Sequence, residues 1–341
     1  MNEKNKVAIN IITTHNEPHL EKCLQSVLEL NPEYVIGYTG DISKEEYQIC
    51  LKYAPNSTYI FEWNDNFSDA RNFIREKTNS SWIIWIDSDE LIEKDSINKI
   101  NKLLESKPKG LYHKFRLIHG STTMGQIRMF YNTDKIKWSY PVHERILFDN
   151  LPQDHYDIEI VHKVQNILRS SDRNIRILKK SIDQDETNPE FHFYIAIEYH
   201  LCGKQMKALL HAEKFLYFNG VKGIDIRKMY MRYLISWINI YHIGNNQKAI
   251  QILLAQLIMN CNISEFWCLL GDAYVRLGKF DSAKQFYSNA ITMGEFKYDN
   301  MWLVDLDKYD KYPKERIKYC EKFNGVDLVE FQKENYQPII P

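Results

Sequence analysis

The beginning of the chain alternates between short β-like runs and amphipathic helical stretches. Val7–Thr14 is rich in β-branched residues, whereas apolar side chains recur at every third or fourth position from residue 20 to 28. These two patterns predict a strand followed by an amphipathic helix. The runs Tyr34–Tyr38 and Tyr59–Trp63 predict two further strands, and a second helical face follows at residues 67–74.

The segment Trp82–Ile86 is apolar at every position, which is typical of a central strand that is buried on both faces. Strands that alternate with helices predict a parallel, Rossmann-like α/β sheet. Ligands of such sheets bind outside the carboxyl ends of the strands. The first candidates for a site are therefore the polar residues that directly follow the predicted strands: Thr13-Thr14, Thr39-Gly40-Asp41 and Asp87-Ser88-Asp89.

The second half of the chain reads almost wholly as amphipathic helices. Gly203, Gly244 and Gly278 are each followed by an alanine five residues later, and the second interval is 34 residues long. This period is that of the tetratricopeptide repeat. Gly271 is one of the small residues that would let two helices of such a repeat touch. We expect about three repeats, with an insertion near residues 219–225.

The change of pattern predicts three parts: an α/β domain at residues 1–165, tetratricopeptide-like helical repeats at residues 166–300, and a C-terminal cap or tail at residues 301–341. A chain of 341 residues is long enough for two domains. The expected fold is therefore an α/β Rossmann-like domain followed by an all-α repeat domain.

The composition argues against several classes of protein. The chain has 44 basic and 45 acidic residues and a formal net charge of −1, so no general positive field attracts a nucleic acid. We expect no signal peptide, because the N-terminus is polar, and no membrane span, because no apolar run reaches about 18 residues. None of the six cysteines forms a CxxC pair, which favours reduced thiols in a cytoplasmic protein.

Two carboxylates one residue apart, Asp87 and Asp89, follow the predicted central strand. Both would point toward the same crevice, where a divalent cation takes carboxylate and phosphate oxygens as ligands. Such a cation neutralises a diphosphate leaving group. The sequence therefore predicts a Mn²⁺ or Mg²⁺ site. The alternative is an acidic loop that caps a helix beginning near Ser96.

Five segments of the chain, taken in order, resemble the motifs of one enzyme family: Thr14–Val27, Trp63–Phe73, Trp82–Glu90, Arg128–Asn132 with the following Trp138, and Pro141–Glu144. The N-terminal half resembles a family 2 glycosyltransferase of the GT-A fold. With the C-terminal repeats, it is similar in architecture to the SunS-like peptide glycosyltransferases. The resemblance implies a metal-dependent, inverting enzyme of the hexosyltransferase type that uses a nucleotide diphosphate sugar, such as a UDP-sugar.

The resemblance also implies roles for the residues near the ends of the first two strands. Thr13, Thr14 and Glu17 would line the uridine pocket. The family often has an aspartate before the Thr-Gly of the second strand, but Tyr38 stands there in this chain. This departure puts the usual contact with the base in doubt and leaves Asp41 as the candidate substitute.

Three further residues receive roles around the donor. Arg71 would contact the base or a phosphate; the alternative is a solvated arginine on a helix. Asp87 would hold the ribose or the metal, and Asp89 the metal itself. His162 resembles the C-terminal histidine that completes the metal or diphosphate site in many GT-A enzymes, with a structural histidine at a domain junction as the alternative.

Inverting transfer needs a general base that takes the proton of the acceptor. Glu144 lies where the resemblance places this base, and the adjacent His143 would orient it or touch phosphate. The alternative is a glutamate and a histidine at the start of a helix.

Two other functions stay open on the sequence. One is an inactive tetratricopeptide adaptor, against which the intact Asp87, Asp89 and Glu144 argue. The other is a nucleotidyltransferase, which usually brings a Gly/Arg-rich loop near the first strand. The acceptor is open as well, because repeat arrays offer concave surfaces to peptides or to a partner subunit. We expect a peptide or protein, or a glycan, as acceptor, and a homodimer through the repeats is a further option.

Overall fold

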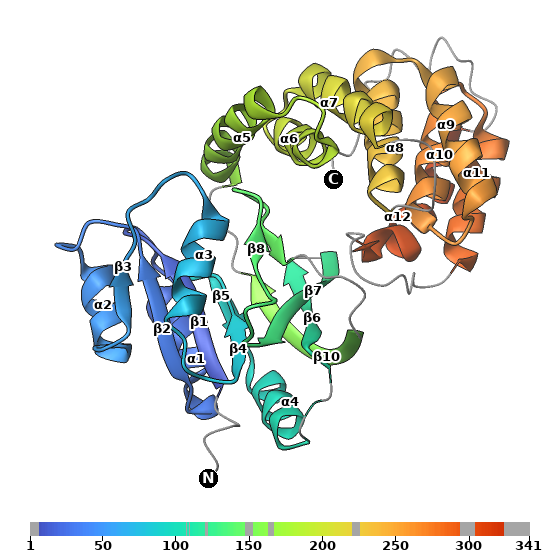
Figure 1. Ribbon diagram of the computed structural model, residues 1–341. Coiled ribbons are helices and arrows are strands. Elements are labelled where there is room, and N and C mark those ends of the chain that lie inside the picture. Colours follow the sequence, from blue (N-terminus) through green and yellow to red (C-terminus); the bar gives the residue numbers. More distant parts are fainter. Residues whose placement is uncertain are drawn as a thin grey trace. The chain divides into compact units, whose positions relative to one another are not determined.

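The computed structural model describes residues 7–106, 108, 110–119, 122–146, 153–162, 167–219, 226–293 and 304–323. The chain forms two compact units, Met1–Ser181 and Ile182–Pro341 (Figure 1). The described part of the first unit combines strands and helices, and that of the second is almost wholly helical. This order of an α/β and a helical unit is the one that the sequence predicts.

Eight strands in the described part of the first unit lie in one mixed sheet, in the order β3-β2-β1-β4-β7-β6-β10-β5. β1, β2, β3 and β4 are parallel, whereas β7 runs antiparallel to both β4 and β6. β10 lies parallel to β6 and antiparallel to β5. The strands are β1 Val7–Thr13, β2 Glu33–Tyr38, β3 Thr58–Ile60, β4 Trp82–Trp85, β5 Glu90–Ile92, β6 Tyr112–His119, β7 Thr122–Tyr131 and β10 Gln153–His162.

The sheet is buried on both faces at its centre. Trp82 and Ile84 of β4 pack into one apolar cluster, and Ile83 and Trp85 pack into a second. Successive side chains of a strand point to opposite faces, so a strand that is covered on both sides is apolar throughout. The helices of this part of the unit are α1 Leu20–Ser26, α2 Glu45–Tyr53, α3 Phe67–Glu76 and α4 Lys94–Glu105, with a 3₁₀ turn at Leu28–Leu30.

A two-stranded hairpin stands apart from the main sheet. It consists of β8 (Trp138–Ser139) and β9 (Arg145–Ile146), which pair antiparallel. Its loop contains Tyr140 and His143, whose φ angles are 76° and 52°. Residues with side chains rarely adopt such left-handed angles, so this loop is a strained segment.

The second unit is built from helices that pack in consecutive pairs, such as α6 with α7 and α10 with α11. A short strand, β11 (Val304–Asp305), and a 3₁₀ turn at Leu306–Tyr309 precede the last described helix, which packs on α11. The helices are α6 Pro189–Leu201, α7 Gln205–Phe218, α8 Ile226–Ile238 with a π turn at Asn239–Ile243, α9 Asn246–Met259, α10 Ser264–Arg276, α11 Phe280–Thr292 and α12 Lys311–Phe323.

The repeat glycines have the conformations that a helix pair needs. Gly203, Gly244 and Gly278 have φ angles of 69°, 80° and 70°, and each follows the first helix of a pair, where glycine commonly ends a helix. A Cβ atom on Gly271 of α10 would lie 2.6 Å from a ring carbon of Tyr287 on α11. Glycine at this position therefore permits the close contact between the two helices.

One helix crosses the division between the units. α5 spans Ile167–Gln184, and the first unit extends to Ser181. Arg176 of α5 forms ion-pair hydrogen bonds of 2.5 and 2.8 Å with Asp65, which fastens the helix to the α/β fold. The sequence analysis placed this helix with the repeats at residues 166–300, whereas its described residues up to Ser181 belong to the first compact unit. Residues 220–225 of the expected insertion and the tail after residue 323 lie outside the described residues.

Across these described ranges, none of the helices has the length and the apolar character that crossing a membrane would require.

Candidate active site

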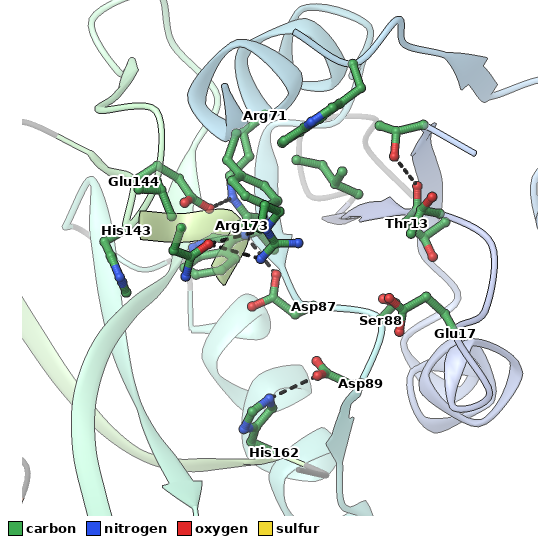
Figure 2. A pocket seen from close by; sticks show the side chains of 18 of the residues that line it. Thr13, Glu17, Arg71, Asp87, Ser88, Asp89, His143, Glu144, His162 and Arg173 are labelled. Carbon is green, nitrogen blue, oxygen red and sulfur yellow. Dashed lines mark hydrogen bonds and ion pairs between the residues drawn. The ribbon is translucent and has the colours of Figure 1, made fainter. Parts of the chain in front are cut away.

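A cavity of about 610 Å³ opens beside the carboxyl ends of the parallel strands in the first unit (Figure 2). Its lining comes from the segments after β1, β2 and β4, from α3, from the β8–β9 loop, from the end of β10 and from α5. The structure brings nine of the residues with a predicted site role to this one cavity, whereas Asp41 lies outside its lining: Thr13, Thr14, Glu17, Arg71, Asp87, Asp89, His143, Glu144 and His162.

The loop after β4 takes its shape from a buried ion pair. Glu90 accepts hydrogen bonds of 2.5 and 2.7 Å from Arg128 of β7, and it also accepts one of 2.8 Å from the backbone N–H of Asp87. The guanidinium of Arg128 lies 3.8 Å from the ring centre of Trp85. Glu90 therefore fixes the turn that presents Asp87 and Asp89. Sequence reasoning assigned no role to Glu90 or Arg128, because their contact spans 38 positions.

Arg71 of α3 joins two of the cavity's carboxylates. Its Nε donates to Glu144 at 2.5 Å, and its Nη2 donates to Asp87 at 2.8 Å. The guanidinium lies 4.2 Å from the ring centre of Trp85 and 5.1 Å from that of Trp138, and its side chain is 5% exposed. Arg71 is therefore not a solvated helix arginine. It connects the loop after β4 to the β8–β9 loop.

This ion pair keeps both charges in place. Burial alone would raise the pKa of Asp87, but the guanidinium groups of Arg71 and Arg128 hold that pKa below its usual range. Burial also opposes the charge on Arg71, and the carboxylates of Glu144 and Asp87 overcome this and raise the pKa of Arg71. Asp87 is therefore ionised and is paired with a charged Arg71.

One face of α3 also holds the backbone of the β8–β9 loop. The amide of Asn72 donates to the backbone oxygen of Trp138 at 3.0 Å and accepts from its backbone N–H at 2.9 Å. The hydroxyl of Ser68 donates to the backbone oxygen of Tyr140 at 2.5 Å, and the backbone N–H of Phe67 donates to the backbone oxygen of Pro141 at 2.8 Å. These contacts hold the strained loop that carries Glu144. The loop is not the start of a helix.

Asp89 and His162 form the second polar pair of the cavity, with 3.0 Å between Oδ2 and Nε2. The hydrogen bond to Asp89 raises the pKa of His162 above its usual value, against the opposing effect of burial. His162 lies opposite Glu90 in the register of β10 with β5, which places the imidazole beside the loop after β4. It is therefore part of the cavity and not a remote junction residue.

These side chains fit a divalent cation only in combination with a substrate. Within the described ranges, no three histidine, cysteine or carboxylate side chains are grouped as a metal site. The carboxylate of Asp89 and the imidazole of His162 lie together, and the side chain of Asp87 is 42% exposed although it is paired with Arg71. Mg²⁺ and similar ions are often held by one or two carboxylates together with phosphates and water. Asp89 and His162 are suited to that arrangement.

The loops after β1 and β2 form the opposite wall. The hydroxyl of Thr13 is buried and has no hydrogen-bond partner in the described structure. A Cβ atom on Gly40 would lie 2.6 Å from the backbone nitrogen of His15, so this wall depends on glycine.

The second strand ends differently from what the resemblance implies. Tyr38 is buried and donates to the backbone oxygen of Asp41, whose carboxylate accepts from the N–H of Ser43 at 2.9 Å. Asp41, the candidate substitute for the contact with the base, does not line the cavity, whereas the neighbouring Thr39 does.

Arg173 and Asn174 of α5 also line the cavity. Sequence reasoning missed both, because it assigned the helix to the repeats. The guanidinium of Arg173 lies 4.7 Å from the ring centre of Phe67. The periodicity of α5 predicts a helix, but nothing in that pattern indicates which unit the helix contacts.

Residues 10–158 match the model of the glycosyl transferase family 2. The glycosyltransferase SunS of Bacillus subtilis strain 168 is 26% identical over 260 residues, which cover 67% of this chain and 57% of that protein. The chain thus spans a little over half the length of this relative. A TPR repeat-containing protein of Synechococcus elongatus is 26% identical over 147 residues, which cover 41% of this chain and 35% of that protein.

Among solved structures, MamA from Desulfovibrio magneticus RS-1 is similar over 49% of this chain and 89% of its own, with 16% identity and a TM-score of 0.34. The assignment of the repeats rests on the consecutive helix pairs and on the glycines that follow the first helix of each pair.

Proposed function

We propose that this chain, whose first unit carries a domain of glycosyl transferase family 2, transfers a sugar from a nucleotide diphosphate donor to an acceptor with inversion at the sugar carbon. One observation carries the proposal. A carboxylate suited to act as base, Glu144, and the carboxylates of the loop after β4 line the same cavity, and Arg71 joins the two loops. The donor proposed is a UDP-sugar, and the type of activity is that of a hexosyltransferase.

In this proposal the donor lies across the wall that Thr13, Thr14 and Glu17 form, with its ribose near Asp87. Asp89 and His162 would hold a Mn²⁺ or Mg²⁺ ion. The ion would supply positive charge to the diphosphate as it leaves. Tyr38 stands in place of the aspartate that usually contacts the nucleotide base. This contact would then fall to other groups of the same wall, and the unpartnered hydroxyl of Thr13 is one of them.

Glu144 acts as the general base. The acceptor atom attacks the anomeric carbon while the bond from this carbon to the phosphate oxygen breaks. The electron pair of that bond leaves with the nucleoside diphosphate, and the acceptor's proton passes to a carboxylate oxygen of Glu144. Arg71 occupies Oε1 of this carboxylate, so we assign the proton to Oε2.

The variant Glu144→Gln tests this role. The glutamine side chain retains an acceptor for Arg71 but lacks the basic carboxylate, so transfer should fall by roughly 10²–10⁴-fold. The affinity for UDP, as measured by calorimetry, should change little because the ground-state complex does not use the base. Normal transfer by the variant would show that another group is the base.

The metal is tested at Asp89. We expect UDP-sugar binding to require Mn²⁺ or Mg²⁺ and to weaken in EDTA, and Asp89→Asn should abolish transfer with the fold intact. A calorimetric affinity that is the same in EDTA and in Mn²⁺ would exclude the role of the metal in donor binding.

The second unit is where the acceptor or a partner subunit would bind. A repeat array offers surfaces to peptides or to a second subunit, so we propose a peptide or protein acceptor, with a glycan as the other choice, and a homodimer through the repeats. We place the reaction in the cytoplasm, where nucleotide sugars are available. The alternative is an inactive adaptor; donor hydrolysis in the presence of Mn²⁺ by the full chain would exclude it.

A further inference from the structure

Gln126 of β7 lines the cavity and is half-buried. Its amide oxygen accepts a hydrogen bond of 3.0 Å from Nε of Arg128. Because an arginine side chain has donors but no acceptor, the amide turns its oxygen toward the guanidinium and its nitrogen away from it. Within the described part of the chain, this amide nitrogen has no hydrogen-bond partner. Gln126 therefore keeps its N–H donors for a ligand of the cavity.

A buried network fixes the orientation of the Gln126 amide from behind. The other two terminal nitrogens of Arg128 donate to the carboxylate of Glu90 at 2.5 and 2.7 Å, and the side chain of Arg128 is 1% exposed. Glu90 also accepts from the backbone N–H of Asp87. The same buried ion pair thus sets both the loop after β4 and the amide of Gln126. A donor that is held in this way loses little side-chain freedom when a ligand binds.

The register of the sheet places Gln126 beside the loop after β4. β7 runs antiparallel to β4, and Met129 pairs with Ile84, so Gln126, three residues earlier on β7, is level with the residues that follow β4. The indole N–H of Trp85 donates to the backbone oxygen of Ile127 at 2.7 Å, which holds the two strands together at this point. In the strand order β2-β1-β4-β7, the loops after β2 and β1 lie on one side of β4, and Gln126 lies on the other.

This order matches the order of the groups in the proposed donor, which are base, ribose, diphosphate and sugar. The base is proposed to lie against the wall of Thr13, and the diphosphate near Asp89. In Figure 2, Thr13 lies on one side of Asp87 and Asp89, and Glu144 lies on the other. A donor that continues past these aspartates therefore brings its sugar toward Glu144, as the transfer requires, and toward the side of the sheet to which β7 belongs.

We propose that the side-chain amide of Gln126 donates a hydrogen bond to a hydroxyl of the donor's sugar and so contributes to the choice of sugar. The inference rests on the proposed function, because it requires a nucleotide sugar in the cavity. A neutral amide is suited to a neutral hydroxyl, whereas phosphate is bound most strongly by charged donors. A site that is built to hydrogen-bond a substrate hydroxyl discriminates against an analogue that lacks it.

Calorimetric titrations of the full chain in Mn²⁺ test this contact with UDP-glucose, UDP-galactose, UDP-N-acetylglucosamine and UDP. Gln126→Met retains a long, unbranched side chain but has no N–H donor. It should weaken binding of the UDP-sugar that the natural protein binds most tightly by roughly 2–10-fold, as expected for one neutral hydrogen bond. The affinity for UDP, which lacks the sugar, should not change.

Deoxy analogues of the same UDP-sugar, each lacking one hydroxyl, identify the group that Gln126 contacts. The analogue without this hydroxyl should bind equally well to the natural protein and to Gln126→Met, because the contact is already missing. The other analogues should still show the loss caused by the substitution.

Two further variants complete the experiment. Gln126→Asn keeps the amide but withdraws it by one methylene group, so it should also weaken binding of the UDP-sugar and spare UDP. Met124→Leu is the matched control, because Met124 lies two positions earlier on the same face of β7 and does not line the cavity. It should change neither affinity. Circular dichroism of each variant checks that it is folded.

The outcomes separate this inference from the proposed function. If both Gln126 variants bind the UDP-sugars as the natural protein does, or if the loss persists with every deoxy analogue, the inference is overturned. Equal weakening of UDP and the UDP-sugar would also overturn it, because Gln126 would then act on the loop after β4 through Arg128. If the natural protein binds neither UDP nor any of the three UDP-sugars in Mn²⁺, the proposed function itself fails.

Discussion

Replacing Arg71 with methionine tests whether one buried cation holds the loop after β4 and the β8–β9 loop together. Methionine retains much of the side-chain volume between Trp85 and Trp138 but has no charge. The change leaves Glu144, whose side chain is 11% exposed, without its counter-charge. Asp87, at 42% exposed, loses a partner too but can be solvated.

The expected loss follows from these exposures. Removing one partner of a fully buried ion pair costs about 3–5 kcal/mol. Because water reaches Asp87, we take the lower end, about 3 kcal/mol. In a domain of 150–250 residues each kcal/mol shifts the midpoint of thermal unfolding by about 2–4 °C, so the first unit should unfold about 6–12 °C lower.

Thermal unfolding followed by circular dichroism measures this shift, and two further variants sharpen it. Arg75→Met on the same helix also removes a buried arginine, but that arginine's nearest carboxylates are 4.0 Å away and exposed. Its Nη1 donates to the backbone oxygen of Thr133, so about 1 kcal/mol is expected. Arg71→Met combined with Glu144→Gln should recover part of the lost stability, because the unpaired carboxylate is gone. An unchanged midpoint in Arg71→Met, or a double variant no more stable than it, would refute the reasoning.

Two other predictions concern stability. The hydrogen bond to Asp89 raises the pKa of His162, so the stabilisation by His162 is complete below the ordinary histidine pKa and is lost as the pH rises through the raised pKa. In urea titrations, the difference in unfolding free energy between the natural protein and His162→Gln should therefore be larger at pH 5 than at pH 9. A difference that is independent of pH would contradict this. Gly271→Ala places a methyl group 2.6 Å from the ring of Tyr287 and should destabilise the second unit by about 1–3 kcal/mol. A midpoint of urea unfolding equal to that of the natural protein would show that α10 and α11 can move apart without loss of stability.

Much of the site could be predicted from local pattern. The apolar run before Asp87 identifies a strand buried on both faces, and the end of such a strand is where a parallel sheet binds its ligands. Asp87, Asp89, Glu144 and His162 all line the cavity, as expected from their positions after strands or in the motifs of the resemblance.

The contacts between these residues could not be predicted in the same way. Arg71 and Glu144 are 73 positions apart, as are Asp89 and His162. Which cation meets which carboxylate depends on strand order and on the loop between β8 and β9, neither of which leaves a periodic signal. The resemblance assigned Arg71 to the donor, but it gave no sign of the two carboxylates of its own chain that Arg71 meets in the structure.

The same limit explains α5. Its apolar period shows that residues 167–184 form a helix, but an amphipathic period does not identify the surface that covers the apolar face. The link to the α/β fold is the pair between Arg176 and Asp65, which are 111 positions apart. Charged residues so distant in the chain carry no information about each other in a single sequence.

The left-handed residues of the β8–β9 loop have a consequence for laboratory evolution. Each of Tyr140 and His143 holds a backbone conformation that disfavours a side chain by about 1–2 kcal/mol. A library screened only for heat resistance should accumulate glycine or asparagine at these two positions, because both residues adopt such angles readily. The same substitutions would loosen the segment that carries Glu144, so the most heat-resistant clones are expected to be poor enzymes.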